Sequence, residues 1–165
     1  MNTSKNKFFD SYQKSKKIFE VEKSAGVIIF YIKENEPLFL LLEYETYWGF
    51  VRGIIEKGEK PEETIKREVK EEANISELKI LEGFKETQEW FYKLKGELVR
   101  KSAVYFLAEI SKEQAEKVRI SFEHKSFKFL TLKEALKIMR IENEKKMLEK
   151  AEAFIKEYKK QKTLV

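Results

Sequence analysis

The fold of this chain is decided by one stretch, Gly53-Ile-Ile-Glu-Lys-Gly-Glu-Lys-Pro-Glu-Glu-Thr-Ile-Lys-Arg-Glu-Val-Lys-Glu-Glu-Ala-Asn-Ile75. Near its end, the carboxylates Glu68, Glu71 and Glu72 follow the spacing i, i+3, i+4, which places them on one stripe of a helix. Clustered carboxylates repel one another unless a cation lies between them. Mg²⁺ prefers oxygen ligands and shares its coordination shell with substrate phosphates. The stretch therefore indicates a metal site for phosphate chemistry.

The same stretch carries the signals that begin and end a helix. Pro61 suits the first helical position, where its missing N–H is not needed. Asn74 stands where a left-handed C-terminal cap is expected. Between them, Ile65, Val69 and Ala73 recur at i, i+4, i+8 and predict an apolar stripe that packs on a sheet.

Four further residues are expected to shape the loop before this helix. Gly53 and Gly58 bracket that loop, and Arg67 can tie its Glu59 to the helix by a bidentate pair. Acidic runs on helices are usually solvated surface, so the three carboxylates alone favour a metal site only weakly. The complete pattern of the stretch changes that balance.

The complete pattern resembles the Nudix box, a signature of metal-dependent hydrolases of nucleoside diphosphate derivatives. One position departs from it, because Asn74 stands where the family has Gly, and Asn tolerates the same backbone conformation. The resemblance implies an α/β fold, an α/β/α sandwich with a central mixed β-sheet. The residues that match the box are Gly53, Glu59, Arg67, Glu68, Val69, Glu71, Glu72 and Ile75.

Composition limits the remaining possibilities. The 165 residues are enough for one domain with a core, and 42% of them are hydrophobic. There is no Cys, no signal-peptide pattern and no run near the roughly 18 apolar residues of a membrane span, so a cytoplasmic protein is expected. The net charge of +5 is spread among interleaved charges, which fits an anionic substrate without requiring nucleic acid. We expect a basic N-terminal arm over residues 1–20 and a Nudix domain over residues 21–165.

Periodicity predicts an order of strands, helix, strands and helices, which matches the implied sandwich. Thr131 and Glu134 form the capping-box pattern at the start of a helix. Strands are predicted at 25–32, 38–42, 78–84, 88–94, 98–110 and 127–130, loops or turns at 34–37, 44–51, 95–97 and 123–124 with 120–122 flanking the last, and helices at 61–73, 131–139 and 142–158.

Segments outside the box resemble the asymmetrically cleaving diadenosine tetraphosphate hydrolases. These segments are residues 81–86, 104–110, 119–130 and 132–135. The resemblance implies metal binding by the carboxylates and by the backbone carbonyl of one glycine, with Mg²⁺ as the ion or Mn²⁺ in its place. The implied metal ligands are Glu68, Glu71, Glu72, Glu123 and Gly53, and the implied catalytic residues are Glu68, Glu71, Arg67 and Glu123, with the base open among the three glutamates.

Substrate contacts are predicted more broadly. Where similar enzymes carry Pro-Lys-Gly, this chain has Val51-Arg52-Gly53, and Arg52 can grip phosphate. Adenine needs a flat apolar partner, although most of the chain's aromatics are expected in the core. The predicted substrate-binding residues are Arg52, Tyr47, Trp90, Tyr92, Lys85 and His124, with solvated surface the simpler interpretation for Lys85 and a local hydrogen bond for His124.

Two alternatives remain open beside hydrolysis of a dinucleoside polyphosphate. One is a Nudix hydrolase of a mononucleotide, ADP-ribose or the 5′ end of RNA. The other is a non-catalytic nucleotide-binding Nudix domain, which would be expected to lose box carboxylates. The expected partner is a small nucleotide, with no membrane, no stable nucleic-acid partner, and a monomeric or homodimeric state.

Overall fold

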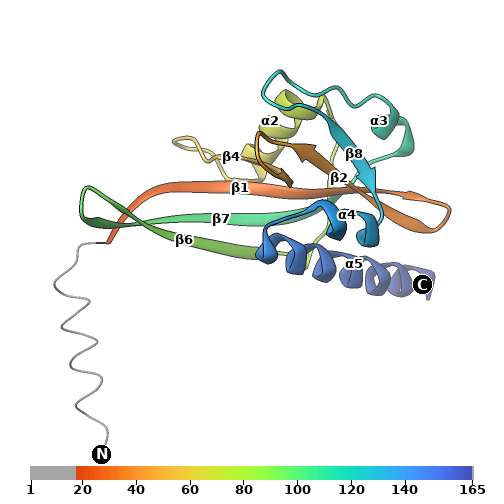
Figure 1. Ribbon diagram of the computed structural model, residues 1–165. Helices are drawn as coiled ribbons and strands as arrows, with labels where there is room; N and C mark the ends of the chain where they lie inside the picture. Colours follow the sequence, from red (N-terminus) through yellow and green to blue (C-terminus); the bar gives the residue numbers. More distant parts are fainter. Residues whose placement is uncertain (1–17, 165) are drawn as a thin grey trace, which may run out of the picture.

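The protein's computed structural model describes residues 18–164, and these form one mixed sheet between two layers of helices (Figure 1). The strand order is β3-β2-β1-β7-β5, with β4 paired to β1, β6 to β7 and β8 to β2. The strands are β1 (Ile18–Lys33), β2 (Glu36–Glu43), β3 (Trp48–Gly49), β4 (Val51–Ile54), β5 (Lys79–Ile80), β6 (Glu86–Leu94), β7 (Glu97–Glu109) and β8 (Phe127–Leu130). The helices are α2 (Pro61–Ala73), α3 (Lys112–Glu116), α4 (Leu132–Ile138) and α5 (Glu142–Thr163).

Strand β1 organises the sheet. It runs parallel to β7 along one edge, and its other edge pairs antiparallel with β4 near its middle and with β2 near its end. The hairpin from β1 to β2 turns at Glu34 and Asn35, whose φ angles of 50° and 66° lie in the left-handed region that such hairpins require. The predicted turn and hairpin are confirmed.

Both faces of the sheet are covered, which explains the unbroken apolar run in β1. Side chains alternate along a strand, so Ile28 and Phe30 face one core while Val27 and Ile29 face the other. Helices α4 and α5 cover the first face, and α2 and α3 lie on the second (Figure 1). The predicted α/β/α sandwich with a central mixed sheet is confirmed.

Helix α2 has the predicted boundaries. The backbone N–H of Lys60 donates to Glu63 at 2.7 Å, which closes the first turn. Asn74 caps the end in the left-handed conformation, with φ 57° and ψ 34°. The predicted stripe of Ile65, Val69 and Ala73 is fully buried against the sheet. Burying a side chain such as Ile65 or Val69 contributes roughly 1.5–3 kcal/mol. The carboxylates lie on the neighbouring stripe, and Glu72 is buried with the apolar residues.

The C-terminal helices also follow the prediction. The Thr131 hydroxyl accepts a hydrogen bond from the backbone N–H of Glu134, which caps α4. Helix α5 begins at Glu142 as predicted, but it extends past Tyr158 to Thr163. The buried members of its apolar stripe are Met147, Leu148, Ala151 and Ile155.

Several predicted boundaries were wrong. The strand expected at 78–84 is only the two-residue β5, because Gly83 adopts φ 93° and turns the chain. The loop expected at 44–51 contains the short β3 and the start of β4, since β3 pairs with the preceding β2 and β4 pairs with β1. Helix α3 was not predicted, although Ser111 caps it by accepting from the N–H of Gln114.

The predicted boundary between arm and domain falls inside β1. Residues 18–20 pair with 98–100 of β7, and a register shift follows between Glu20 and Glu22. The rest of the predicted arm, residues 1–17, lies outside the described residues.

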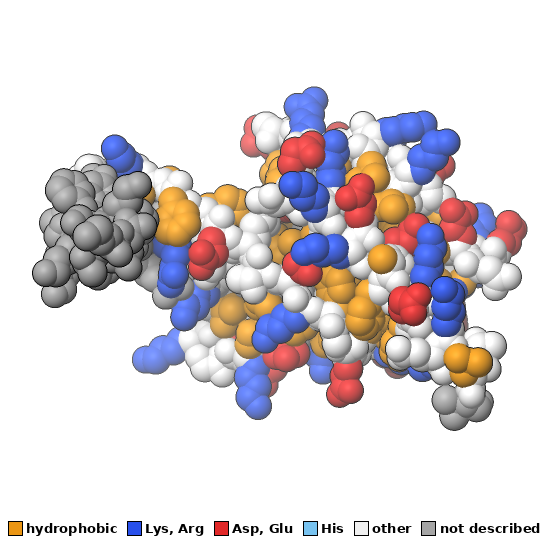
Figure 2. All heavy atoms as spheres, turned by 90° about the horizontal axis from the view of Figure 1, so that it is seen from below, with side chains coloured by type: hydrophobic (Ala, Val, Ile, Leu, Met, Phe, Trp, Pro, Cys, Tyr) orange, Lys and Arg blue, Asp and Glu red, His pale blue; other side chains and the backbone are white. Residues whose placement is uncertain are grey.

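No helix among residues 18–164 is long and apolar enough to cross a membrane. On the face that carries α5, basic and acidic side chains are interspersed (Figure 2).

Candidate active site

Arg67 ties the loop before α2 to the helix. Its Nε donates to Glu59 Oε1 at 2.6 Å and its Nη2 to Glu59 Oε2 at 3.0 Å, so the predicted bidentate pair is present. The remaining donors reach the Ile54 carbonyl at 3.1 Å and Glu68 Oε1 at 2.8 Å. The hydrogen bonds from Arg67, aided by one from the Glu56 N–H, lower the pKa of Glu59 to about 2. The pair therefore stays ionised and fixes the loop.

Gly53 sits where no side chain could fit. A Cβ at this position would lie 2.0 Å from Glu68 Oε1, so glycine is what allows the Glu68 carboxylate to reach the backbone of β4. Burial raises the pKa of Glu68, while the Arg67 hydrogen bond acts against that rise. The predicted ligands Gly53 and Glu68 are thus neighbours, which is consistent with both facing one ion.

Glu72 is the buried centre of the carboxylate group. It is 6% exposed, and its Oε2 has no hydrogen-bond partner among the described residues. Ligand atoms of Glu72, Glu123 and His124 all lie within 4.8 Å of one another. Burial, followed by repulsion from Glu68, Glu123 and Glu71, raises the pKa of Glu72 to about 8.

These features fit a divalent cation. A buried carboxylate oxygen without a partner is costly, and like charges that raise its pKa mark a place where positive charge would be stabilised. Glu68, Glu72 and Glu123 supply the oxygen donors that Mg²⁺ prefers. Glu71 is mostly exposed and lies 3.7 Å from Arg67 Nη1, at the edge of the group.

His124 lies behind Glu72 and away from open surface. Its Nε2 is 3.1 Å from Glu72 Oε1, and its ring meets the Tyr44 ring edge-on at 4.6 Å. Burial lowers the pKa of His124, which favours the neutral imidazole at pH 7. This arrangement matches the simpler expectation of a local hydrogen bond, and it orients the Glu72 carboxylate.

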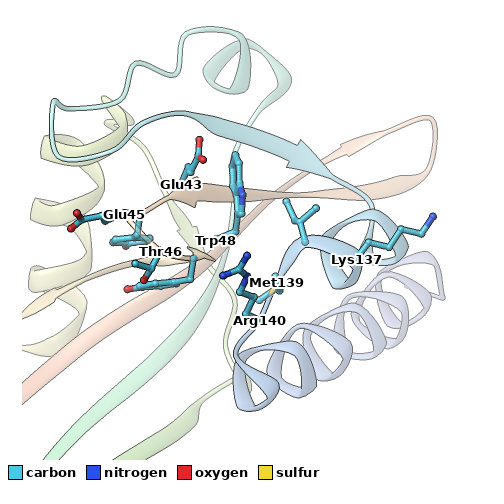
Figure 3. Close-up of a pocket in the computed structure, with 10 residues that line it drawn as sticks. Glu43, Glu45, Thr46, Trp48, Lys137, Met139 and Arg140 are labelled. Atoms are coloured by element: carbon cyan, nitrogen blue, oxygen red, sulfur yellow. The ribbon is translucent and has the colours of Figure 1, made fainter.

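A hollow of about 640 Å³ lies between residues 43–48 and the end of α4 (Figure 3). Tyr44 lines it on the side nearest His124, and Tyr47 stacks on Tyr44 with ring centroids 4.7 Å apart. The predicted stacking candidate Tyr47 therefore belongs to this hollow. Its lining residues are Glu43, Tyr44, Glu45, Thr46, Tyr47, Trp48, Lys137, Ile138, Met139 and Arg140.

Arg52 and Trp90 come together on the face of the sheet that carries α5. The Arg52 guanidinium lies 5.1 Å from the centre of the Trp90 ring, and its Nη1 donates to the Tyr105 hydroxyl at 3.2 Å. That hydroxyl lies 3.5 Å from Glu144 Oε1. Sequence reasoning missed Tyr105 and Glu144. The spacing of Glu144 from Met147 and Leu148 places it on the buried stripe of α5 and could have flagged it.

The other two candidates lie outside this group. Tyr92 is half-buried two residues further along β6, with the Lys101 ammonium 5.7 Å from its ring centre. Lys85 is exposed, with its ammonium 5.9 Å from the centre of the Phe106 ring. The structure therefore brings Arg52 to Trp90 and leaves Tyr92 and Lys85 with other neighbours.

The NUDIX domain family matches residues 22–151, which is most of the chain. The chain belongs to the Nudix family. The resemblance of the sequence to the Nudix family is therefore confirmed.

Relatives of this Nudix protein share a particular name. It is 34% identical over 140 residues to the asymmetrical bis(5′-nucleosyl)-tetraphosphatase of Caenorhabditis elegans, covering 82% of this chain and 97% of the relative. The enzyme of that name from Rattus norvegicus is 33% identical over 144 residues, covering 81% and 95%. The crystal structure of a C. elegans Ap4A hydrolase binary complex matches with a TM-score of 0.70 and 34% identity, over 82% of this chain and 98% of that one.

Proposed function

We propose that this Nudix protein hydrolyses dinucleoside polyphosphates, and that it cleaves diadenosine tetraphosphate to ATP and AMP. The observation that carries the proposal is the intact carboxylate group of α2, with Glu123 brought close to Glu72 by a separate loop. The match covers nearly the whole length of these relatives, and their names support the choice of substrate.

The metal ligands would be Glu68, Glu72 and Glu123, with Glu71 at the edge of the group and the Gly53 carbonyl beside Glu68. Mg²⁺ bound there would offset the charge of the polyphosphate and acidify a water molecule. His124 holds one oxygen of Glu72 in place, so its other oxygen is left to face the cation.

Proton removal from the attacking water needs a carboxylate that is ionised and within reach. Glu68 accepts a hydrogen bond from Arg67 and is less available for this role. Glu123 is exposed and stands next to Glu72, which makes it the base we favour over Glu71. Arg67 would act by positioning, because its donors are engaged by Glu59, Glu68 and a backbone carbonyl.

One nucleotide would be bound between the carboxylates and β6. Arg52 can donate to phosphate while its guanidinium lies over Trp90, so phosphate and adenine contacts would be adjacent. Tyr47, which stacks on Tyr44 in the lining of the hollow, offers a second aromatic surface. A fixed span between a stacked base and the carboxylates would select one phosphorus and give unequal products.

Product analysis of diadenosine tetraphosphate hydrolysed with Mg²⁺ in ¹⁸O-labelled water tests the proposal. We expect ATP and AMP in equal amounts, with the label in one of them. Two molecules of ADP would contradict the geometry, and a higher kcat/KM for ADP-ribose, a mononucleotide or triphosphate-ended RNA would contradict the substrate. No turnover of any nucleotide in the panel would favour the non-catalytic alternative. Preference for Mg²⁺ over Mn²⁺, a cytoplasmic location and a monomeric or homodimeric state remain predictions.

A further inference from the structure

Phe122 is exposed to an unusual degree for a large apolar side chain. Its exposed fraction is 98%, whereas the other strongly exposed phenylalanine of the described residues, Phe91, is 54% exposed. It directly precedes Glu123, whose carboxylate belongs to the group that fits a cation. The sequence expectation placed it in a segment flanking the loop, so its full exposure calls for a physical reason.

The loop that carries Phe122 is fixed at several points. The N–H of His124 donates to the Ser121 carbonyl at 3.2 Å, so Phe122 and Glu123 are the two central residues of a tight turn. The N–H of Ser121 donates to the Glu72 carbonyl at 3.1 Å, and that of Lys125 to the Glu43 carbonyl at 3.0 Å. These bonds hold the turn against the end of α2 and the end of β2, as the loop's path past α2 shows (Figure 1).

An exposed aromatic side chain on a fixed turn, next to a carboxylate of the proposed metal site, can bind a flat ligand. Every nucleobase has a flat face that stacks on an aromatic side chain without regard to its hydrogen-bonding edge. A single ring is too small to form a protein-docking surface by itself. The turn that carries Phe122 is bonded to the end of α2, which lies on one face of the sheet, whereas Trp90 packs against the core on the other face.

We propose that Phe122 stacks on the second nucleobase of a dinucleoside polyphosphate, the base at the opposite end of the phosphate chain from the one held near Trp90. The inference rests on the proposed hydrolysis of such substrates. The turn would place this base next to Glu123, so that the two ends of the substrate are held on either side of the metal ligands. Phe122 is then a specificity residue for substrates with two nucleosides, and it takes no part in the chemical step.

The test compares two substrates that differ by one nucleoside. Phe122→Ala and Phe122→Trp would be assayed with diadenosine tetraphosphate and with adenosine 5′-tetraphosphate, each with Mg²⁺. We expect Phe122→Ala to raise KM for the dinucleotide about tenfold, the order of one lost base–aromatic contact, with kcat little changed. KM for the mononucleotide should stay as in the wild type, and Phe122→Trp should restore the dinucleotide value.

Phe91→Ala is the matched control, because it removes an exposed phenylalanine from β6 without touching the turn. It should change neither KM. An equal loss on both substrates in Phe122→Ala would show that the ring only supports the turn, and unchanged constants would show that it has no role; either result overturns the inference. If the wild type hydrolyses the mononucleotide and leaves the dinucleotide intact, the proposed function itself fails.

Discussion

Glu72 combines burial with a carboxylate oxygen that has no protein partner, and this makes it the sharpest test of the metal site. Glu72→Gln keeps the size of the side chain and the acceptor oxygen that lies near His124, but removes the charge. We expect kcat with Mg²⁺ to fall by orders of magnitude while the thermal midpoint of the metal-free protein is unchanged or higher, because repulsion from Glu68 and Glu123 is relieved. Glu62→Gln, in the exposed first turn of the same helix, is the control. Near-normal turnover by folded Glu72→Gln would remove Glu72 from the ligand set.

Substitution of Arg67 tests whether its positioning role depends on the several hydrogen bonds that one guanidinium can donate at once. Arg67→Lys keeps the positive charge but cannot bond both oxygens of Glu59 and the Ile54 carbonyl together. We expect kcat to fall and the amide hydrogens of residues 56–59 to exchange faster, since both effects come from one loosened loop. A variant with slower turnover but wild-type exchange in this loop would indicate that Arg67 acts on the substrate directly.

At the scale of elements, α5 buries a carboxyl against the sheet. Burial raises the pKa of Glu144 to about 7, although Arg52 opposes the rise. In the unfolded chain this group ionises near its ordinary value of 4.5. Between these values the folded protein holds a proton that the unfolded chain has released, so stability falls as pH rises. Relative to Glu144→Gln, the wild type should lose up to about 3 kcal/mol of unfolding free energy between pH 4.5 and 7.

Urea unfolding of both proteins across that pH range measures the difference. Other titrating groups, Glu72 included, are common to the pair and cancel. Below pH 4.5 and above pH 7 the difference in unfolding free energy between the wild type and Glu144→Gln should not change with pH. The Glu144 carboxyl then has the same charge in the folded and unfolded states. The difference between the wild type and Glu149→Gln, a substitution on the exposed side of α5, should not change with pH. A pH-dependent difference of equal size for Glu149→Gln, or a constant difference for Glu144→Gln, would contradict the buried-carboxyl interpretation.

The elements that the sequence predicted well are those whose signals are local. Helix α2 is bounded by Pro61 and Asn74, and β1 by an apolar run and a turn, so neighbours in the sequence are sufficient to define them. Strands β3 and β4 were missed because their stability comes from pairing with β2 and β1, which local propensity does not register. Helix α3 is five residues long and carries only its Ser111 cap as a signal.

At the scale of the whole molecule, the candidate site is assembled from distant segments. The box carboxylates and the Arg67–Glu59 pair could be predicted because they share one helix and its loop. The packing of Tyr105 with Glu144 could not, since it depends on Gly26, where a Cβ would lie 2.4 Å from the Tyr105 ring. Such contacts across the sheet become visible only when the strands and α5 are packed together.

Metal binding should couple this assembly to global stability. The proposed ligands come from α2 and from the loop before β8, so an ion held between them would stabilise the folded state and have no matching site in the unfolded chain. When the free Mg²⁺ concentration is about 100 times the dissociation constant, the unfolding free energy rises by roughly 2.7 kcal/mol. We expect the thermal midpoint of the wild type to rise steadily with Mg²⁺ and to return to its metal-free value when EDTA is added.

Glu72→Gln should lose most of this rise, whereas Glu62→Gln should keep it, because only the first substitution removes a ligand. Calorimetry at constant ionic strength, set with NaCl, separates specific binding from general screening of surface charge. An equal rise in all three proteins would mean that Mg²⁺ acts by screening alone. A rise confined to the wild type and Glu62→Gln would show that the ion binds at Glu72, as the proposed hydrolysis requires.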